Sequence, residues 1–549
     1  MIRDIKRLTN EEFDILIIGG GISGAAIAWD AALRGHKTAL IEKNDFGSAT
    51  SAATSKLIHG GLRYLSKLDI RVVRESLRER RLLEQNISYQ AFPLSFLLPV
   101  YNYYSKPGWM INIGLSLYDI LSYDRNDLKD PDKHLGKHRW LSKKEALKLE
   151  PALSEKGLKG AYHYYDVLNK HPERSNLDFI LSAVEKGAVA VNYMNFQKFL
   201  LNSINDKKTV TGITAKDEIT KTLIDIKAKV TVNATGPWGD IVLSKLHKNP
   251  VKTLTRSKGI HILVPRIQKN TAITLETKDK HHFFIIPWLD YSLIGTTDTA
   301  FTGNSDDLKV TKKDIESFIK VINDNYPVNL KYEQVLHAYA GIRPLVSESK
   351  TANTYETSRK HEIVDHKKVE NIKGLVSVFG GKWTTSRSLA EETVNKLEKL
   401  TGLERIKCKT DSTSLNGDDV GERLSNFIDE AVEKWSGKFS IKLIHHLIEY
   451  YGSYYEKILK LAQKNPKLLE PLEKGLLHIK AEIIYAVEDE SAVKLSDVLL
   501  RRCGIGNRGL PSDNCINETA DLMAKILKWD KKTKNDEISS YKESQKITD

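Results

Sequence analysis

The stretch FDILIIGGGISGAAIAWDAALRGHKTALIEK, residues 13–43, decides the fold of this chain. It begins with DILIIG, a short apolar run bounded by glycine, which is typical of a buried parallel strand. An alanine-rich segment then extends to Leu33 and predicts a helix, and Gly35 stands where such a helix ends. A second apolar run, TALIEK, follows. The pattern predicts one strand–helix–strand unit.

Three glycines, Gly19, Gly21 and Gly24, lie between the first strand and the helix. This GxGxxG spacing permits a tight turn and lets a pyrophosphate approach the backbone N–H groups at the helix N-terminus. Glu42 ends the second strand, where a carboxylate can accept hydrogen bonds from a ribose diol. Strand, glycines, helix and acid in this order predict a dinucleotide site.

A second GxGxxG match, in CGIGNRG at residues 503–509, lies in a different context. The preceding segment, LSDVLLRR, has a helical pattern, and Pro511 follows where a helix would have to continue. We interpret the match as a loop that ends a helix. The chain then has one dinucleotide site, which favours a tightly held flavin over FAD together with NAD(P)H.

The rest of the chain predicts two further domains. SKGIHILVP, HHFFIIPW and YSLIGTTD are short apolar runs separated by turns, which predict an antiparallel sheet over about 255–298. Residues 375–399 repeat the order strand, glycine pair, helix. After residue 400 the strand signals end and amphipathic helical patterns predict a small helical domain. The charged end of the chain, from residue 529, predicts a frayed terminus.

Composition limits the class of protein. The 549 residues, 40% of them hydrophobic and 28% charged, are typical of a globular chain of several domains. Three cysteines without a CxxC motif cannot form a disulfide framework and fit a reducing compartment. The chain shows no apolar leader and no apolar run of about 18 residues, so we expect neither a signal peptide nor a transmembrane helix.

The net charge of +13 fits an anionic substrate, an anionic membrane surface or nucleic acid. Because the basic residues are interleaved with acidic ones, we expect no nucleic-acid partner. Residues 68–90 predict a helix whose charged side chains face solvent. Residues 91–122, rich in aromatic residues and leucine, fit either a membrane interface or ordinary core packing. The neighbours His281 and His282 would point to opposite faces of a strand, so we expect no metal site.

Taken together, these motifs resemble the FAD-dependent, quinone-linked glycerol-3-phosphate dehydrogenases. The resemblance extends from about residue 14 to 506 and is carried by the blocks ATSAATSKLIHGGLRYL, NATGPW, SKGIHILVP, YAGIRPL, FGGKWTT and AVEDESAVKLSDVLLRRCGIG. The blocks around SKLIHGGLRYL and FGGKWTT are together specific to that family.

The resemblance implies an α/β fold with three parts. The first is an FAD-binding Rossmann-like domain of the glutathione-reductase/D-amino-acid-oxidase type, expected to be discontinuous over 14–90, 160–245 and 350–398. The second is an antiparallel-sheet substrate domain at 91–159 and 246–349. The third is a helical C-terminal domain at 400–528, followed by the charged tail 529–549.

The same resemblance implies that the loop of residues 50–67 lies against FAD. The residues expected to bind the cofactor are Gly19, Gly20, Gly21, Ser23, Gly24, Glu42, Lys43, Ser51, Thr54, Ser55, Lys56, Leu57, His59, Gly60, Ala234, Gly236, Gly380, Gly381, Lys382 and Thr384.

Six residues are expected near the substrate: Arg63, Tyr64, His261, Arg343, Arg359 and Lys382. Guanidinium groups pair well with phosphate, so Arg63 and Arg359 are expected to hold it. Arg343 and Lys382 are expected to polarise the C2 oxygen. His261 is the expected proton acceptor, because histidine titrates near neutrality. Structural roles remain open for Arg343 as an ion-pair partner, for Arg359 within a charged run and for His261 in the core.

The implied activity is oxidation of sn-glycerol 3-phosphate to dihydroxyacetone phosphate, with FAD taking the hydride and ubiquinone or menaquinone taking the electrons. We expect a cytoplasmic enzyme attached peripherally to the anionic inner face of the cytoplasmic membrane. Two alternatives remain: the protein could form a homodimer, and it could be an oxidase that reduces O2 to H2O2. An amine or amino-acid oxidase on the same fold fits less well, because several cations suit a phosphate better than a carboxylate.

Overall fold

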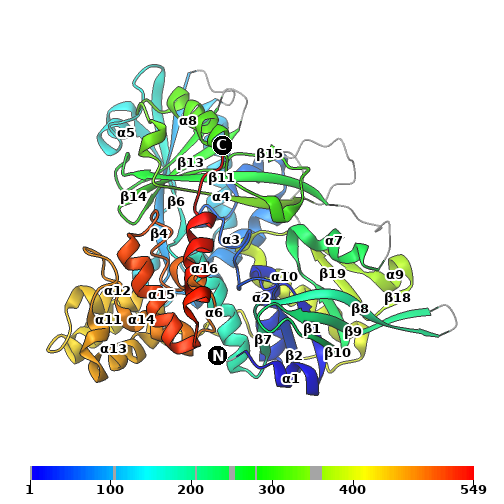
Figure 1. Cartoon of the computed structure of the whole chain (residues 1–549). Helices are drawn as coiled ribbons and strands as arrows, with labels where there is room; N and C mark the ends of the chain where they lie inside the picture. Colours follow the sequence, from blue (N-terminus) through cyan, green and yellow to red (C-terminus); the bar gives the residue numbers. More distant parts are fainter. Residues whose placement is uncertain (1–2, 103–106, 205–206, 247–253, 278–280, 346–360) are drawn as a thin grey trace.

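The computed structural model describes residues 3–102, 107–204, 207–246, 254–277, 281–345 and 361–549. Two large sheets lie next to each other, and a group of helices from the C-terminal part of the chain packs beside them (Figure 1).

The first sheet is built on the strand–helix–strand unit that the sequence predicts. Strand β1 (Glu12–Ile18), helix α2 (Ile22–Leu33) and strand β2 (Thr38–Ile41) follow one another, and β1 pairs in parallel with β2. The strand order is β17-β19-β10-β1-β2-β7, and β8, β9 and β18 extend the sheet. The bounds are β7 (Val189–Val191), β8 (Met194–Ile204), β9 (Lys207–Asp217), β10 (Leu223–Asn233), β17 (Glu362–Asp365), β18 (Ile372–Lys373) and β19 (Leu375–Phe379).

Helices α2, α6 (Pro172–Glu185) and α10 (Ser386–Thr401) pack together against the first sheet. The buried face of α2 is rich in alanine, which lets its neighbours approach closely. Strands β1, β2, β7, β10 and β19 run in parallel, so their carboxyl ends share one edge of the sheet. In parallel sheets this is the edge where ligands bind.

The second sheet has the order β15-β11-β14-β13-β12-β4-β6-β3, with β16 and β5 attached, and its predicted strands over 255–298 are confirmed. Its pairings are antiparallel except that of β12 with β4. The bounds are β3 (Leu57–Ile58), β4 (Ala91–Tyr101), β5 (Arg139–Ser142), β6 (Leu158–Asn169), β11 (Thr255–Pro265), β12 (Ala272–Glu276), β13 (His282–Trp288), β14 (Tyr291–Gly295), β15 (Thr299–Ala300) and β16 (His337–Leu345).

The expected domain boundaries differ from the observed sheets at β3 and β6. Both strands were expected in the FAD-binding segments, yet they pair with each other in the second sheet, where β6 also pairs along the length of β4. An apolar pattern predicts a strand but not the strand with which it pairs. The assignment of β3 and β6 to the second sheet therefore required the tertiary structure.

The C-terminal part is helical, as predicted, with α11 (Leu424–Trp435), α12 (Ile441–Tyr451), α13 (Tyr455–Lys464), α14 (Lys480–Glu488) and α15 (Asp513–Leu527). The expectation of a frayed end is wrong. Residues Lys531–Ser544 form helix α16, which packs on α15 and buries Tyr541. Beyond it, Lys312 N donates to Thr548 O at 2.8 Å. A few apolar side chains are enough to hold a charged segment in a packed helix when a neighbouring helix covers them.

Helix α3 (Ile70–Asn86) corrects a second expectation in part, because three of its charged side chains, Glu79, Arg80 and Glu84, are buried. Arg387 of α10 pairs with Glu79 at 2.7 Å, and Arg80 pairs with Asp166 of β6 at 2.6 Å. The spacing of charges along a helix does not tell whether their partners come from solvent or from another element.

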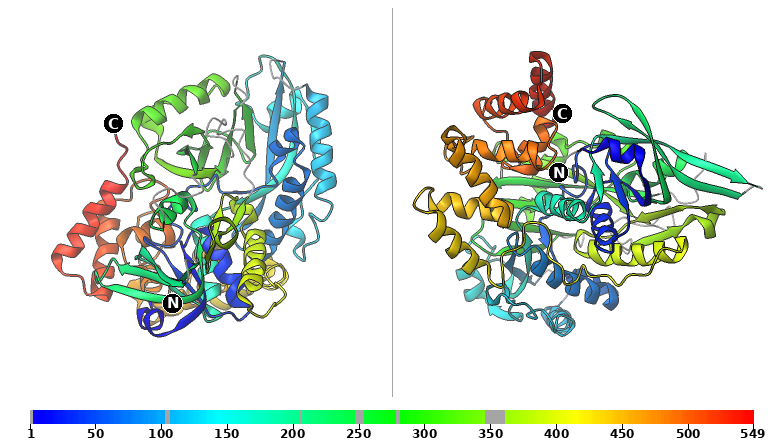
Figure 2. Two further views of the ribbon diagram at one scale, coloured as in Figure 1. Left: turned by 90° about the vertical axis from the view of Figure 1, so that its right-hand side faces the viewer. Right: turned by 90° about the horizontal axis from the view of Figure 1, so that it is seen from below.

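Residues 91–122 divide into a strand and a helix. Strand β4 lies in the second sheet, whereas helix α4 (Gly108–Leu121) lies at the outer edge of the molecule beside α3 (Figure 2). Only Leu115 and Tyr118 of α4 are buried. None of the described helices has both the length and the apolar character needed to cross a membrane.

Candidate active site

A cavity of about 560 Å³ lies along the carboxyl edge of the first sheet and reaches the second sheet. Most of the predicted site residues line it, although they come from distant parts of the sequence. They are Gly19, Gly21, Ser23, Glu42, Lys43, Ser51, Thr54, Ser55, Leu57, His59, Tyr64, Ala234, Gly236, His261, Arg343, Gly380, Gly381, Lys382 and Thr384.

The other predicted cofactor residues act from outside the cavity lining. Gly20 N donates to Glu42 Oε2 at 2.8 Å. A Cβ on Gly24 would stand 1.9 Å from Gly19 O, so this glycine allows α2 to pack on β1. Lys56 is buried, and its ammonium group pairs with Glu173 at 2.9 Å, so its role at the cofactor stays a prediction for its backbone.

Gly60 likewise does not line the cavity, but its peptide anchors the loop that does. Gly60 N–H donates to Tyr118 Oη at 2.9 Å and lies 3.2 Å from Asp166 Oδ1. Tyr118 O–H donates to Asp166, whose carboxylate also pairs with Arg80. Because Tyr118 is one of the two buried residues of α4, that exposed helix is tied directly to the loop.

One end of the cavity fits the pyrophosphate and ribose of FAD. Gly19 has φ +109°, and a Cβ there would stand 2.6 Å from Ala234 O, so the backbone turn requires glycine. Ile22 N donates to Ser51 Oγ at 2.8 Å, which leaves the serine hydroxyl hydrogen for a phosphate oxygen. Glu42 Oε1 accepts from Asn44 N at 2.9 Å, and burial raises the pKa of Glu42.

Two cations meet at the ring of Tyr64, at another part of the cavity. Lys382 Nζ lies 4.1 Å from the ring centroid, and the Arg63 guanidinium lies 5.0 Å from it. Arg63 Nη2 also donates to Tyr64 Oη at 3.0 Å, although Arg63 itself does not line the cavity. Lys382 Nζ donates to Ser76 Oγ at 2.9 Å. The aromatic ring thus holds both cations in place.

Arg343 brings a third cation to the cavity, from the second sheet. Its Nη2 donates to Thr296 Oγ1 at 2.7 Å and to Thr297 O at 3.1 Å. Asp298 lies 3.7 Å from its Nη1, and Gly259 makes room, since a Cβ there would stand 2.2 Å from Nη2. Burial lowers the pKa of Arg343, but a guanidinium remains protonated in proteins.

His261 is buried, with its ring stacked on Tyr339 at 5.1 Å and its Nε2 2.8 Å from Ser55 Oγ. Burial, followed by the charges of Arg343 and Lys56, lowers the pKa of His261 to about 3. His261 is therefore neutral at neutral pH, and so low a pKa makes it a weak base. A bound phosphate dianion would raise this pKa, and the assignment as proton acceptor stays a prediction. His59, a second histidine, lines the same cavity.

The predicted phosphate-binding Arg359 lies outside the described residues. Several lining residues were not predicted, among them Met194–Gln197 at the start of β8 and the pair Trp238 and Asp306. Trp238 Nε1 donates to Asp306 Oδ1 at 3.0 Å, and the ammonium group of Lys43 pairs with Asp306. No local pattern marks these residues, because their common position depends on the packing of the two sheets.

Comparison with known proteins agrees with this geometry. A family model described as FAD dependent oxidoreductase matches residues 14–394. A second one, described as the C-terminal domain of alpha-glycerophosphate oxidase, matches residues 408–534.

Individual proteins are similar over nearly the whole chain. Glycerol-3-phosphate dehydrogenase of Synechocystis sp. is 35% identical over 518 residues, 92% of this chain and 91% of that protein. Aerobic glycerol-3-phosphate dehydrogenase of Staphylococcus saprophyticus is 35% identical over 537 residues, 95% of this chain and 92% of that protein. The X-ray structure of glycerol-3-phosphate dehydrogenase from Bacillus halodurans complexed with FAD matches with a TM-score of 0.79 and 28% identity, covering 100% of this chain and 98% of that one.

Proposed function

Because the chain belongs to the FAD-dependent glycerol-3-phosphate dehydrogenase family, we propose that it oxidises sn-glycerol 3-phosphate to dihydroxyacetone phosphate and that ubiquinone or menaquinone takes the electrons. FAD, when bound, supplies the acceptor for the hydride that leaves C2. The observation that carries the proposal is the gathering of Arg63, Arg343 and Lys382 around a cavity that also fits FAD.

The residues of this chain would bind and orient the substrate. Arg63 and Arg359 would hold the phosphate dianion, for which a guanidinium fork is well suited. Arg343 and Lys382 would donate to the C2 oxygen, where negative charge develops as the hydroxyl proton leaves. His261 would take that proton. The charge of the bound phosphate would raise the pKa of His261 and so improve it as an acceptor.

An anaerobic titration tests the activity. Glycerol 3-phosphate is added to the purified yellow protein while the flavin absorbance is followed, and either a ubiquinone analogue or air is then admitted. We expect bleaching, fast recovery with the quinone and slow recovery with air. A flavin that is not bleached would contradict the substrate, and glycerol 1-phosphate serves as the matched control for stereochemistry.

The second candidate is an oxidase of the same family, which would pass the electrons to O2 and form H2O2. The match of residues 408–534 to the C-terminal domain model of alpha-glycerophosphate oxidase favours it. The same titration separates the two, because the oxidase would recover fast in air and release peroxide.

We also propose that the protein attaches peripherally to the inner face of the cytoplasmic membrane, and the exposed side chains of helix α4 support this. Trp109, Ile113 and Ile120 are 64%, 59% and 67% exposed. Their spacing of four and seven residues places them on one face of the helix. On the neighbouring α3, Arg71 and Arg78 are exposed and suit anionic headgroups.

Ile113→Asp is therefore expected to lower binding to anionic phospholipid vesicles at least about tenfold, because a charge on the apolar face opposes insertion. Co-sedimentation with vesicles measures this. The control is Ile441→Asp, since Ile441 is 53% exposed at the start of another helix, α12. Equal binding by both variants would contradict a membrane seat on α4.

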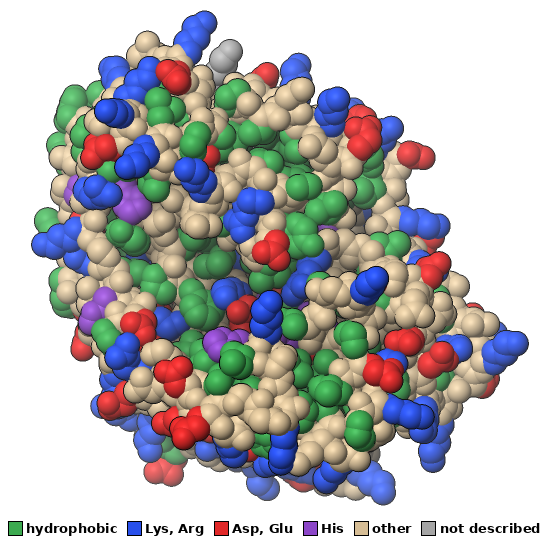
Figure 3. Space-filling view, turned by 90° about the vertical axis from the view of Figure 1, so that its left-hand side faces the viewer, with side chains coloured by type: hydrophobic (Ala, Val, Ile, Leu, Met, Phe, Trp, Pro, Cys, Tyr) green, Lys and Arg blue, Asp and Glu red, His purple; other side chains and the backbone are tan. Residues whose placement is uncertain are grey.

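The face of the molecule shown in Figure 3 gives little support to a nucleic-acid partner. On the face shown in Figure 3, Lys and Arg side chains are interspersed with Asp and Glu side chains. A nucleic-acid interface instead gathers basic residues along a stripe or groove.

A further inference from the structure

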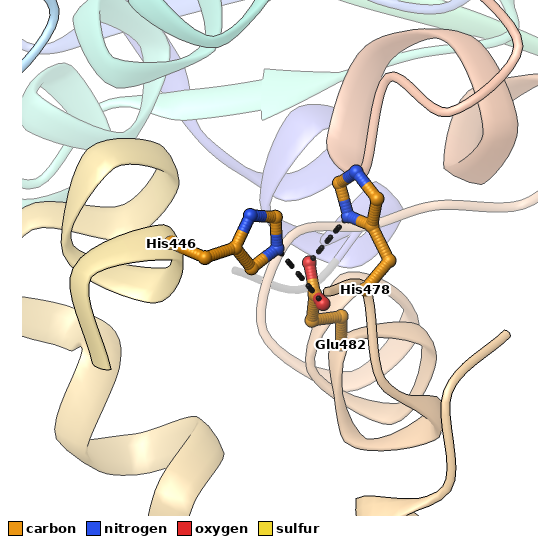
Figure 4. Close-up of side chains that lie close together, drawn as sticks. All are labelled: His446, His478 and Glu482. Carbon is orange, nitrogen blue, oxygen red and sulfur yellow. Dashed lines mark hydrogen bonds and ion pairs between the residues drawn. The ribbon is translucent and has the colours of Figure 1, made fainter. Parts of the chain in front are cut away.

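The helical C-terminal region brings two histidines and a glutamate together (Figure 4). His446 lies on α12, His478 lies just before α14, and Glu482 lies in the first turn of α14. His446 Nε2 is 3.4 Å from Glu482 Oε1, and His478 Nδ1 is 3.2 Å from Glu482 Oε2. One potential ligand atom from each residue lies within 4.8 Å of the other two. None of the three lines the flavin cavity.

The cluster is closed off from solvent. The side chains of His478 and Glu482 are 0% exposed, and that of His446 is 7% exposed. His446 Nε2 is buried, faces the glutamate and has no hydrogen-bond partner among the described residues. The contact of this nitrogen with Glu482 Oε1, at 3.4 Å, is an ion-pair distance and not a hydrogen bond (Figure 4), so a bound cation would give its lone pair a better partner.

Outer contacts hold the carboxylate in its orientation. Ile479 N–H donates to Glu482 Oε1 at 2.7 Å, and Tyr451 O–H donates to Glu482 Oε2 at 2.9 Å. The rings of His446 and His478 stand edge to face with centroids 4.4 Å apart. Such outer hydrogen bonds are the arrangement that orients carboxylate ligands in metal sites.

We propose that His446, His478 and Glu482 bind one Zn²⁺ ion through two imidazoles and one carboxylate, with the fourth position open to water. Zn–N and Zn–O bonds of about 2.0–2.2 Å place the ligand atoms of a tetrahedral site roughly 3.3–3.6 Å apart. The observed separations are 3.4 Å from His446 Nε2 to Oε1 and 3.2 Å from His478 Nδ1 to Oε2, which are different oxygens of the same carboxylate. Since one ligand atom from each residue lies within 4.8 Å of the other two, small side-chain rotations would bring the three atoms to the spacing of a zinc site. Two imidazole ligands favour zinc over Ca²⁺ or Mg²⁺, which prefer oxygen ligands.

The site would join α12 to the start of α14 and thus stabilise the helical region. The sequence led us to expect no metal site. His446 and His478 are 32 residues apart, and only the fold places them beside each other. The proposal is independent of the activity, since the cluster lies outside the flavin cavity.

Zinc binding to the full-length, FAD-loaded protein tests the proposal. Protein stripped with a chelator and dialysed is titrated with ZnCl2, and bound zinc is measured by mass spectrometry alongside the unfolding temperature. We expect one zinc per chain and a higher unfolding temperature. His446→Ala should weaken zinc binding more than about 100-fold, since losing a ligand exceeds the roughly 10- to 100-fold effect of losing an outer contact.

His445→Ala is the matched control, because His445 is the adjacent, exposed histidine on the same helix. It should bind zinc as the unaltered protein does. Glu482→Gln keeps the size of the third ligand and gives a second variant if His446→Ala does not fold, which the flavin absorbance spectrum reports. Absence of bound zinc in the unaltered protein, or equal binding by His446→Ala and His445→Ala, would overturn the proposal.

Discussion

Replacing Arg343 by alanine is expected to lower kcat/KM for glycerol 3-phosphate about 10²–10³-fold, the usual effect of removing one donor to a developing oxyanion. In the proposed mechanism this guanidinium donates to the C2 oxygen. Its position is defined by donation to Thr296 and Thr297 and by the space that Gly259 leaves. The fall should appear in the rate of anaerobic flavin reduction, measured by stopped flow.

Two further variants serve as comparisons for Arg343→Ala. Arg343→Lys keeps the charge but loses the planar fork, so it should recover part of the rate and not all of it. Arg139→Ala removes an exposed arginine of β5 in the same sheet and should reduce flavin at the normal rate. All three proteins should retain FAD. An Arg343→Ala protein that reduces its flavin as fast as the unaltered one would exclude Arg343 from the reaction.

The second large effect is expected for Asp45→Ala, which should lower the free energy of unfolding by about 3–5 kcal/mol. Asp45 follows β2 and accepts from Arg501 Nε at 2.6 Å and from Arg502 Nη1 at 2.8 Å. Asp45 and Arg502 are 0% exposed in their side chains. Its removal takes away the buried carboxylate that the two guanidinium groups share and leaves them Asp497 at 2.7 Å from Arg501 and Glu490 at 3.9 Å from Arg502. It also removes one of the contacts between the FAD-binding sheet and the C-terminal helices.

Thermal unfolding of the FAD-loaded protein measures this loss. Asp521→Ala, which removes an exposed partner of Lys534, is the control and should change the stability by less than about 1 kcal/mol. An Asp45→Ala protein as stable as that control would contradict the role of the buried cluster.

The effect of Asp45 should also depend on pH. Burial alone would raise the pKa of Asp45, but Arg502 and Arg501 hold it well below its usual range. A carboxyl group whose pKa is lowered by folding contributes stability above the pKa of the unfolded chain, about 3.9. That contribution is lost as the pH falls below this value. The difference between the unaltered protein and Asp45→Ala should therefore be full at neutral pH and shrink in acid.

The sequence by itself determined the strand–helix–strand unit, and its resemblance to a known family implied the FAD-binding fold and many of the residues that line the cavity. The strand–helix–strand unit depends on local rules, such as apolar periodicity and the need for glycine at Gly19 and Gly24. The comparisons confirm FAD and the fold class. The residue roles, the quinone and the membrane seat stay proposals.

The tertiary structure alone decided which charged residues turn inward and which distant residues meet. The ammonium group of Lys56 pairs with the buried Glu173, and Asp306, from the short 3-10 helix Ser305–Asp307, lines the cavity. The buried charges of α3 and the packed helix α16 are further cases. A charged side chain has the same sequence pattern whether it faces water or a partner far along the chain. Its free energy depends on that partner, and only the folded chain supplies it.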